Sequence, residues 1–229
     1  MGTTWEELEL RATTFIKNDL SLDWDKANRL PVFFNRMTAY MIEAIPKLNR
    51  PPEMLAKLSN YTAPQFESVS YTTVAAQESQ SIDTDVTGAD VFSVGILAEN
   101  ELGDVSYTPV TDASYDAESG IVTLPGAYEA GTQIEVDLYT SGSFDVDLND
   151  TEKGILAFAI YNRYEHRFDN DVLERQAKIR DSAFTTISEA SQTQAGTARQ
   201  REVDSQLYAM LRAYQDNLEY LALKKYMKI

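Results

Sequence analysis

The sequence contains no cysteine and only one histidine, His166. Without cysteine the chain has no disulfide, no thiolate nucleophile and no thiolate metal ligand. A single histidine also excludes a zinc site built from the usual nitrogen and sulfur ligands. His166 lies among alternating charges in a segment with helical periodicity, which favours a surface or interfacial residue over a catalytic base.

Long hydrophobic runs and nucleotide-binding motifs are absent too. The longest apolar stretch, residues 91–98, is interrupted by Ser93 and Gly95 and is much shorter than the ~20 residues of a membrane helix. Residues 1–7 have neither the basic nor the hydrophobic region of a secretory signal. No glycine-rich phosphate-binding loop and no Gly-x-Ser-x-Gly motif occurs. We expect a protein that is made in a cytoplasm and does not enter a membrane.

Basic residues are missing from one long segment of the chain. Residues 59–148 contain no Lys or Arg, whereas 16 Asp and Glu lie between Glu67 and Asp147. These account for the whole net charge of −16, because the remaining 20 acidic residues equal the 20 Lys and Arg in number. Such a break in composition predicts a domain boundary. Residues 64–148 are therefore expected to form an acidic insert in an otherwise charge-balanced chain.

Helical signals precede the insert. Thr4 followed by Glu7 is typical of a capping box at the start of a helix. A second helix is predicted for residues 31–45, which begin with one proline and end before another, and a third for residues 49–58. The first helix has apolar residues at helical spacing, namely Trp5, Leu8, Ala12, Phe15 and Ile16.

The insert itself has the alternation of strands. After Pro64, apolar and polar residues alternate with a period of two, and β-branched and aromatic residues are frequent. Turn residues such as Gly103, Gly120 and Gly131 separate the apolar runs. This pattern predicts a small antiparallel sandwich or barrel. The candidate strands are residues 66–74, 91–97, 105–110, 121–124, 133–140 and 144–148.

Helical signals return after the insert. Residues 149–152, with the sequence Asn-Asp-Thr-Glu, predict a helix start, and the residues that follow up to Phe168 are apolar around nearly the whole circumference. A helix of this kind lies in the centre of a bundle, or between one subunit and its neighbour. We further predict a short helix for residues 172–184, a flexible connection for residues 188–198 and a long last helix from about Thr197.

Together these patterns predict an α+β fold. Residues 1–63 and 149–229 form a helical bundle body, and residues 64–148 form the inserted acidic all-β domain. The last helix should pack on other helices through an apolar stripe. The stripe consists of Val203, Leu207, Met210, Tyr214, Leu218 and Leu221.

Candidates for chemistry are weak. Carboxylates that share a strand face are the arrangement of glycosidases, but a solvent-facing acidic sheet is the simpler interpretation. Residues 83–88 and 145–149 begin like calcium-binding loops, yet neither has the Glu required at the twelfth position. An irregular calcium site is the alternative, but we predict no catalytic residue, no cofactor and no metal ligand. The two carboxylate pairs are Glu135 with Asp137 and Asp145 with Asp147.

Two segments and the order of the elements resemble the head-to-tail connector (adaptor) family of tailed bacteriophages. The segments are Thr-Trp-Glu-Glu-Leu at residues 4–8 and the stretch from Asn149 to Glu165. In that family, bundles of short helices assemble into rings of about a dozen subunits around the DNA channel, beneath the portal. The acidic insert departs from the smaller, mostly helical members.

The resemblance implies a structural protein of the virion neck, assembled in the host cytoplasm. Its partners would be copies of itself, the portal protein and other neck or tail proteins. Double-stranded DNA would pass through the channel without sequence-specific binding. A low density of cations suits this role, because it reduces attraction to phosphate.

The expected interface residues lie on the two C-terminal helices. The lysines among them either interact with the helix dipole or dock on an acidic partner. The residues are Ile155, Phe158, Ile160, Tyr164, Leu207, Met210, Tyr214, Leu218, Lys224, Lys225 and Lys228.

Two other functions compete with the connector. The insert would be a carbohydrate- or surface-recognition module if its tyrosines formed a stacking platform, although tyrosines among strands more often fill a core. An enzyme acting through the carboxylates is the third interpretation. The tyrosines are Tyr107, Tyr115, Tyr128 and Tyr139.

Overall fold

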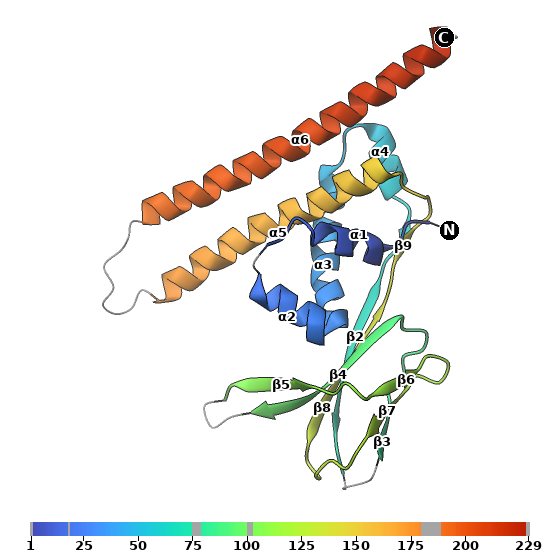
Figure 1. Cartoon of the computed structure of the whole chain (residues 1–229), viewed down its shortest axis with the longest axis vertical. Coiled ribbons are helices and arrows are strands. Elements are labelled where there is room, and N and C mark those ends of the chain that lie inside the picture. Colours follow the sequence, from blue (N-terminus) through green and yellow to red (C-terminus); the bar gives the residue numbers. More distant parts are fainter. Residues whose placement is uncertain (1, 18, 75–78, 100–102, 180–188, 228–229) are drawn as a thin grey trace.

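Helices occupy one end of the molecule and strands extend from them to the other end (Figure 1). The fold combines α-helices with antiparallel sheets, as the sequence predicted. The described strands form open sheets and do not close into a barrel. The computed structural model describes residues 2–17, 19–74, 79–99, 103–179 and 189–227, and among these the side chains outside residues 168–195.

Four α-helices and a short 3-10 helix precede the strands. Thr4 caps the first helix by accepting a hydrogen bond of 3.3 Å from the Glu7 N–H, which confirms one half of the predicted capping box, whereas the Glu7 carboxylate binds Lys153. The second helix was not predicted, because Leu22 is its only buried residue and the apolar period is therefore weak. The elements are α1 (Trp5–Ala12), α2 (Leu20–Asn28), α3 (Leu30–Ala44), η1 (Ile45–Lys47) and α4 (Pro52–Leu58).

Among the described residues, nine strands follow, in three antiparallel sheets. The largest sheet has the order β2-β8-β4-β5, the second has the order β3-β7-β6, and β1 pairs with β9. In the largest sheet, Gln65 lies opposite Thr140 and Thr72 lies opposite Gln133. The strands are β1 (Tyr61–Thr62), β2 (Gln65–Thr72), β3 (Ser79–Asp83), β4 (Val91–Glu99), β5 (Val105–Pro109), β6 (Ser114–Asp116), β7 (Ile121–Pro125), β8 (Gln133–Thr140) and β9 (Ser143–Phe144).

Five of the six predicted strands are confirmed, and the sixth is wrong beyond its first residue. Residues 145–148 are not a strand, because their backbone bonds to other parts of the chain. The Asp145 N–H donates to the Asn60 carbonyl at 3.1 Å, and the Leu148 N–H donates to the Thr3 hydroxyl at 2.8 Å. Strands β1, β3 and β6 were not predicted, because they are short and mostly polar.

Two long helices complete the chain: α5 (Asp150–Ile179) and α6 (Glu189–Met227). Reciprocal hydrogen bonds confirm the predicted start of α5, because the Glu152 N–H donates to Asn149 Oδ1 and the Asn149 N–H donates to Glu152 Oε2. Two other predictions are wrong. Residues 172–179 continue α5 and are not a separate helix, and residues 189–198 are helical and not a flexible connection. Residues 180–184 of the predicted short helix lie outside the described part.

The described residues form two hydrophobic clusters. The larger lies among the helices and includes Trp5, Phe34 and Ile155, together with Tyr139 from β8 and Phe144 from β9. The smaller lies among the strands, and both the four-stranded and the three-stranded sheet contribute to it, for example through Val136 and Val122. Strand β8 therefore contributes to both clusters, because Tyr139 near its end belongs to the core of the helices.

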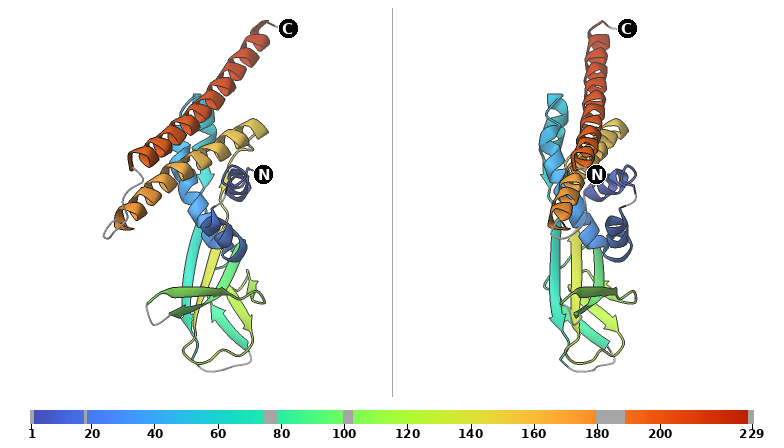
Figure 2. Two further views of the ribbon diagram at one scale, coloured as in Figure 1. Left: turned by 60° about the vertical axis from the view of Figure 1, so that its left-hand side comes forward. Right: turned by 90° about the vertical axis from the view of Figure 1, so that its left-hand side faces the viewer.

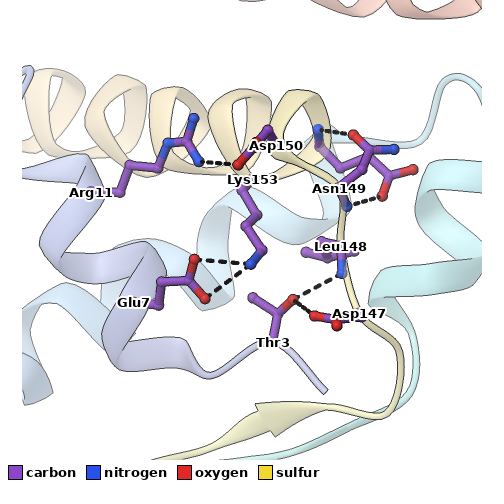
Figure 3. Close-up of polar contacts among 9 residues, drawn as sticks. Thr3, Glu7, Arg11, Asp147, Leu148, Asn149, Asp150 and Lys153 are labelled. Carbon is purple, nitrogen blue, oxygen red and sulfur yellow. Dashed lines mark hydrogen bonds and ion pairs between the residues drawn. The ribbon is translucent and has the colours of Figure 1, made fainter. Parts of the chain in front are cut away.

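Polar contacts join the N-terminal segment and α1 to the start of α5 (Figure 3). The Lys153 ammonium donates to both oxygens of Glu7 at 2.9 and 3.1 Å. The Arg11 guanidinium lies 3.6 Å from the Asp150 carboxylate. Helices from before and after the strands in the sequence therefore form one body.

Candidate functional site

The structure places the predicted α5 interface residues in the core of the chain itself. Ile155 and Ile160 are fully buried, and Phe158 and Tyr164 nearly so. Helix α5 packs against α1, α3 and α6 of the same chain. The chain alone therefore satisfies the apolar circumference of this helix, and the physical argument for a neighbouring subunit at these residues no longer holds.

The predicted stripe of α6 faces α5 for most of its length. Val203, Leu207 and Tyr214 are buried, and Met210 and Leu218 pack against the same core. Polar pairs support the packing, because Arg199 donates to Glu165 at 2.6 Å. These side chains attach α6 to its own body.

A buried carboxylate fixes the point at which α6 leaves the body. Glu152 accepts a hydrogen bond from the Lys57 ammonium at 2.6 Å and another from the Tyr214 hydroxyl. Burial by itself would raise the pKa of Glu152, but the bonds from Lys57, Tyr214 and the Asn149 N–H outweigh it and lower that pKa. The carboxylate therefore stays charged and joins α4, α5 and α6.

Beyond this point α6 exposes large apolar side chains. The helix projects from the body on the side opposite the sheets, as both views of Figure 2 show. Lys224 and Lys225 lie in this part, whereas Lys228 lies outside the described residues. We name its last turns, residues 220–227, the α6 end; they contain both lysines and no carboxylate. Its apolar residues and their exposed fractions are Tyr220 63%, Leu221 52%, Leu223 59%, Tyr226 86% and Met227 65%.

The carboxylates Glu135 and Asp137 share one face of β8, but the expectation of a solvent-facing sheet is wrong at this point. Asp137 is fully buried, and Arg29 binds both carboxylates. The guanidinium donates to Asp137 from Nε at 3.0 Å and from Nη2 at 2.8 Å, and to Glu135 from Nη2 at 2.7 Å. The Ser68 hydroxyl donates to Asp137 at 2.9 Å. Because their oxygens already accept these hydrogen bonds, the two carboxylates stabilise the fold and are poorly suited to acid–base catalysis.

Arg29 was not predicted to have a role, because it lies 106 residues before Glu135 and precedes a helix that needs no side-chain cap. Its guanidinium carbon lies 4.3 Å from the centre of the Tyr107 ring. That ring covers Gly95, where a Cβ would come within 2.1 Å of it. The rings of Trp24 and Tyr107 form a T-shaped contact, with their centres 5.9 Å apart. This cluster joins α2 and α3 to the largest sheet.

Glu9 is another buried carboxylate, and it lies between the helices and the largest sheet. Glu9 accepts hydrogen bonds from the Thr38 hydroxyl at 2.8 Å and from the Tyr139 hydroxyl at 3.3 Å. Burial raises the pKa of Glu9 to about 8, although the two hydrogen bonds act in the opposite direction. At neutral pH this side chain is therefore mostly protonated.

The other acidic candidates do not converge. Asp145 and Asp147 lie in the irregular segment before α5, where the Asp147 carboxylate accepts a bond from Thr3. Asp83 accepts a hydrogen bond of 3.1 Å from the Asp85 N–H and so closes a local turn. Within the described part of the chain, no three His, Asp or Glu residues are placed to hold a metal ion.

The four tyrosines of the predicted sugar platform lie apart. Tyr139 is buried among the helices, and Tyr107 covers Gly95. Tyr115 donates to the Val86 carbonyl at 2.8 Å, and Tyr128 donates to the Pro125 carbonyl at 3.3 Å. They serve local packing and do not share a surface.

His166 lies on α5 and is partly exposed. Its Nε2 lies 3.0 Å from the Asp204 carboxylate of α6, so it takes part in the contact between the two helices.

Comparisons with known proteins add no family assignment. No protein-family model matches the chain, and the searches of curated proteins and of solved structures found no significant match. Among the described residues, no helix combines the length and hydrophobicity that crossing a membrane requires.

Proposed function

We propose that this chain is a non-catalytic subunit of a ring-forming head-to-tail connector in a tailed bacteriophage. The ring would link the portal to the neck and tail and surround the DNA channel. The strands, which we interpret as a small antiparallel sandwich, would project from the helical body of each subunit.

The observation that carries this proposal is the α6 end. Monomeric soluble proteins rarely expose five large apolar side chains on neighbouring turns of one helix, and exposed groups of this kind mark contacts with other proteins. The anchor at Glu152 holds the start of this part in place, so the exposed side chains cannot fold back onto the same body without breaking it. An assembly subunit accounts for such a helix.

Two further observations support the proposal. The paired carboxylates that could have served an enzyme are bound by Arg29. The strands carry no cation, and the net charge of −16 disfavours retention of DNA. A subunit that lines or surrounds a DNA channel benefits from this charge.

The test is assembly of the full-length protein, alone and with its portal protein. Mass photometry and negative-stain electron microscopy should show rings, or rings bound to the portal. The proposal is refuted if the protein remains a monomer under both conditions.

A further inference from the structure

Helix α2 carries a second apolar face that is largely exposed. Leu20 is 83% exposed and Trp24 42% exposed, and both lie on the same side of the helix as exposed Ala27. Leu22, on the opposite side, is buried against the body. Leu20 and Ala27 are therefore free of contacts that the fold of α2 depends on, whereas Trp24 is half exposed and also contacts Tyr107 of β5.

Strand β5 extends this face. The contact between Trp24 and Tyr107 brings β5 next to α2. Val105 lies on the same side of the strand as Tyr107 and is 62% exposed. We name Leu20, Trp24, Ala27 and Val105 the α2 face.

Carboxylates border the α2 face. Asp23 is exposed beside Trp24, and Glu99 is exposed directly opposite Val105 in the sheet. Cross-strand partners lie on the same side of a sheet, so Glu99 lies at the edge of the apolar surface. The α6 end has the opposite character, with apolar side chains accompanied by Lys224 and Lys225.

We propose that the α6 end of one copy packs on the α2 face of the next copy. The two surfaces match in polarity and are opposite in charge, and every copy supplies both. Figures 1 and 2 show that they cannot meet within one chain, because the α6 end projects away from the sheets and α2 lies beside them. A contact between different surfaces of successive copies is the heterologous kind that closes into rings.

This inference rests on the proposed ring and names the contact that builds it. It also assigns the α6 end to a sibling copy, whereas the sequence left open that its lysines dock on another acidic partner, such as the portal. An experiment on the full chain can separate the two occupants.

The absence of cysteine allows a clean crosslinking test. A variant with Ala27→Cys and Ala222→Cys, treated with a bismaleimide, should give a ladder of dimers, trimers and larger species on a denaturing gel. Each single substitution can give at most a dimer, because one thiol per chain joins only two chains. The matched control combines Ala222→Cys with Ala117→Cys, which lies in the exposed turn after β6 and should give no ladder.

Two substitution experiments test the same contact independently of the crosslinking gel. Trp24→Ala should weaken self-association about 30-fold, the size of effect seen for central aromatic residues of an interface. Reversing both lysines, Lys224→Glu with Lys225→Glu, should also weaken it, and adding Asp23→Lys with Glu99→Lys should restore it. A cooperative melting transition shows that each variant folds; for Trp24→Ala a lower melting temperature is expected, because the contact with Tyr107 is lost.

The outcomes distinguish the inference from the proposed function. If the unmodified protein forms rings but the Ala27 and Ala222 pair gives no more than dimers, or no more ladder than the control pair, the inference is wrong and the connector proposal stands. The single variant Ala222→Cys, labelled with a maleimide that carries a photoreactive group, tests the other occupant. A photo-crosslink to the portal, with none between copies, also shows that the inference is wrong and leaves the connector proposal standing. A protein that is monomeric with and without its portal overturns both.

Discussion

Replacing Arg29 tests the cluster that joins the helices to the largest sheet. Arg29→Met keeps most of the length and apolar volume of the side chain and removes its charge and donors. Three hydrogen bonds of 2.7 to 3.0 Å to Glu135 and Asp137 are then lost. Asp137 is fully buried and cannot reach water to compensate.

The expected loss in the free energy of unfolding is about 3–5 kcal/mol, the range for removing one partner of a buried ion pair. Ser68 and Ser93 still donate to Asp137, at 2.9 and 3.4 Å, so the lower end of that range is expected. A loss of this size is a large fraction of the total stability of an ordinary domain, about 5–15 kcal/mol. Most of it is the cost of leaving a buried charge without a counter-charge.

The assay is urea unfolding followed by tryptophan fluorescence, since Trp24 lies against the cluster and Trp5 lies in the helical core. Combining Arg29→Met with Glu135→Gln and Asp137→Asn should recover at least half of the loss, because no buried charge then remains.

Two further variants make this test decisive. The control Arg11→Met removes an exposed pair and should cost no more than about 0.5 kcal/mol. Arg29→Lys, which keeps the charge and loses the fork of donors, should cost about 1–2 kcal/mol and serves if the methionine variant does not fold. A loss below about 1 kcal/mol in Arg29→Met, or no recovery in the combined variant, refutes the reasoning.

Three more predictions concern other parts of the fold. Because the pKa of Glu9 is raised to about 8 from 4.5, its contribution to stability is greatest below pH 4.5 and falls as the pH rises towards 8, by about 1.4 kcal/mol per pH unit. Glu9→Gln should remove this fall, which chemical denaturation at several pH values would show; parallel pH curves for the two proteins contradict it. Gly95→Ala should cost about 1–3 kcal/mol, because the new Cβ overlaps the Tyr107 ring, and a melting temperature within error of the parent argues against that overlap. Asn149→Ala removes the hydrogen bond to the Glu152 N–H and should cost about 1 kcal/mol, measured by urea unfolding, and an unchanged unfolding midpoint would mean that the cap does not matter.

Local chemistry let the sequence predict many elements closely. Strand β8 was predicted with the bounds that it has, because alternation and β-branched residues act within a few positions. The start of α5 was predicted from Asn149 and Glu152, because a capping box needs only residues three apart. The absence of Lys and Arg from residues 59–148 is likewise visible in the sequence, and it indicated the segment that forms the acidic strands.

Elements with a weak apolar periodicity were harder to predict from the sequence. Helix α2 has one buried residue, and residues 189–198 lack the large apolar side chains that a helix pattern depends on. Alanine, glutamine and glutamate nevertheless favour a helix, and the neighbouring turns of α6 extend it through them. The pattern for α5 left two interpretations open, and only the packing showed that its own chain buries it.

By itself, then, the sequence determined the α+β class, the places of most helices and strands, and the segregation of charge. The tertiary structure alone decided that Arg29 binds the two central carboxylates, that Glu9 is buried, and that the α6 end and the α2 face remain uncovered. Local propensity depends on neighbours along the chain, whereas burial and ion pairing depend on residues that meet only after the chain has folded. A contact over 106 residues, such as that between Arg29 and Glu135, leaves no periodic signal to read.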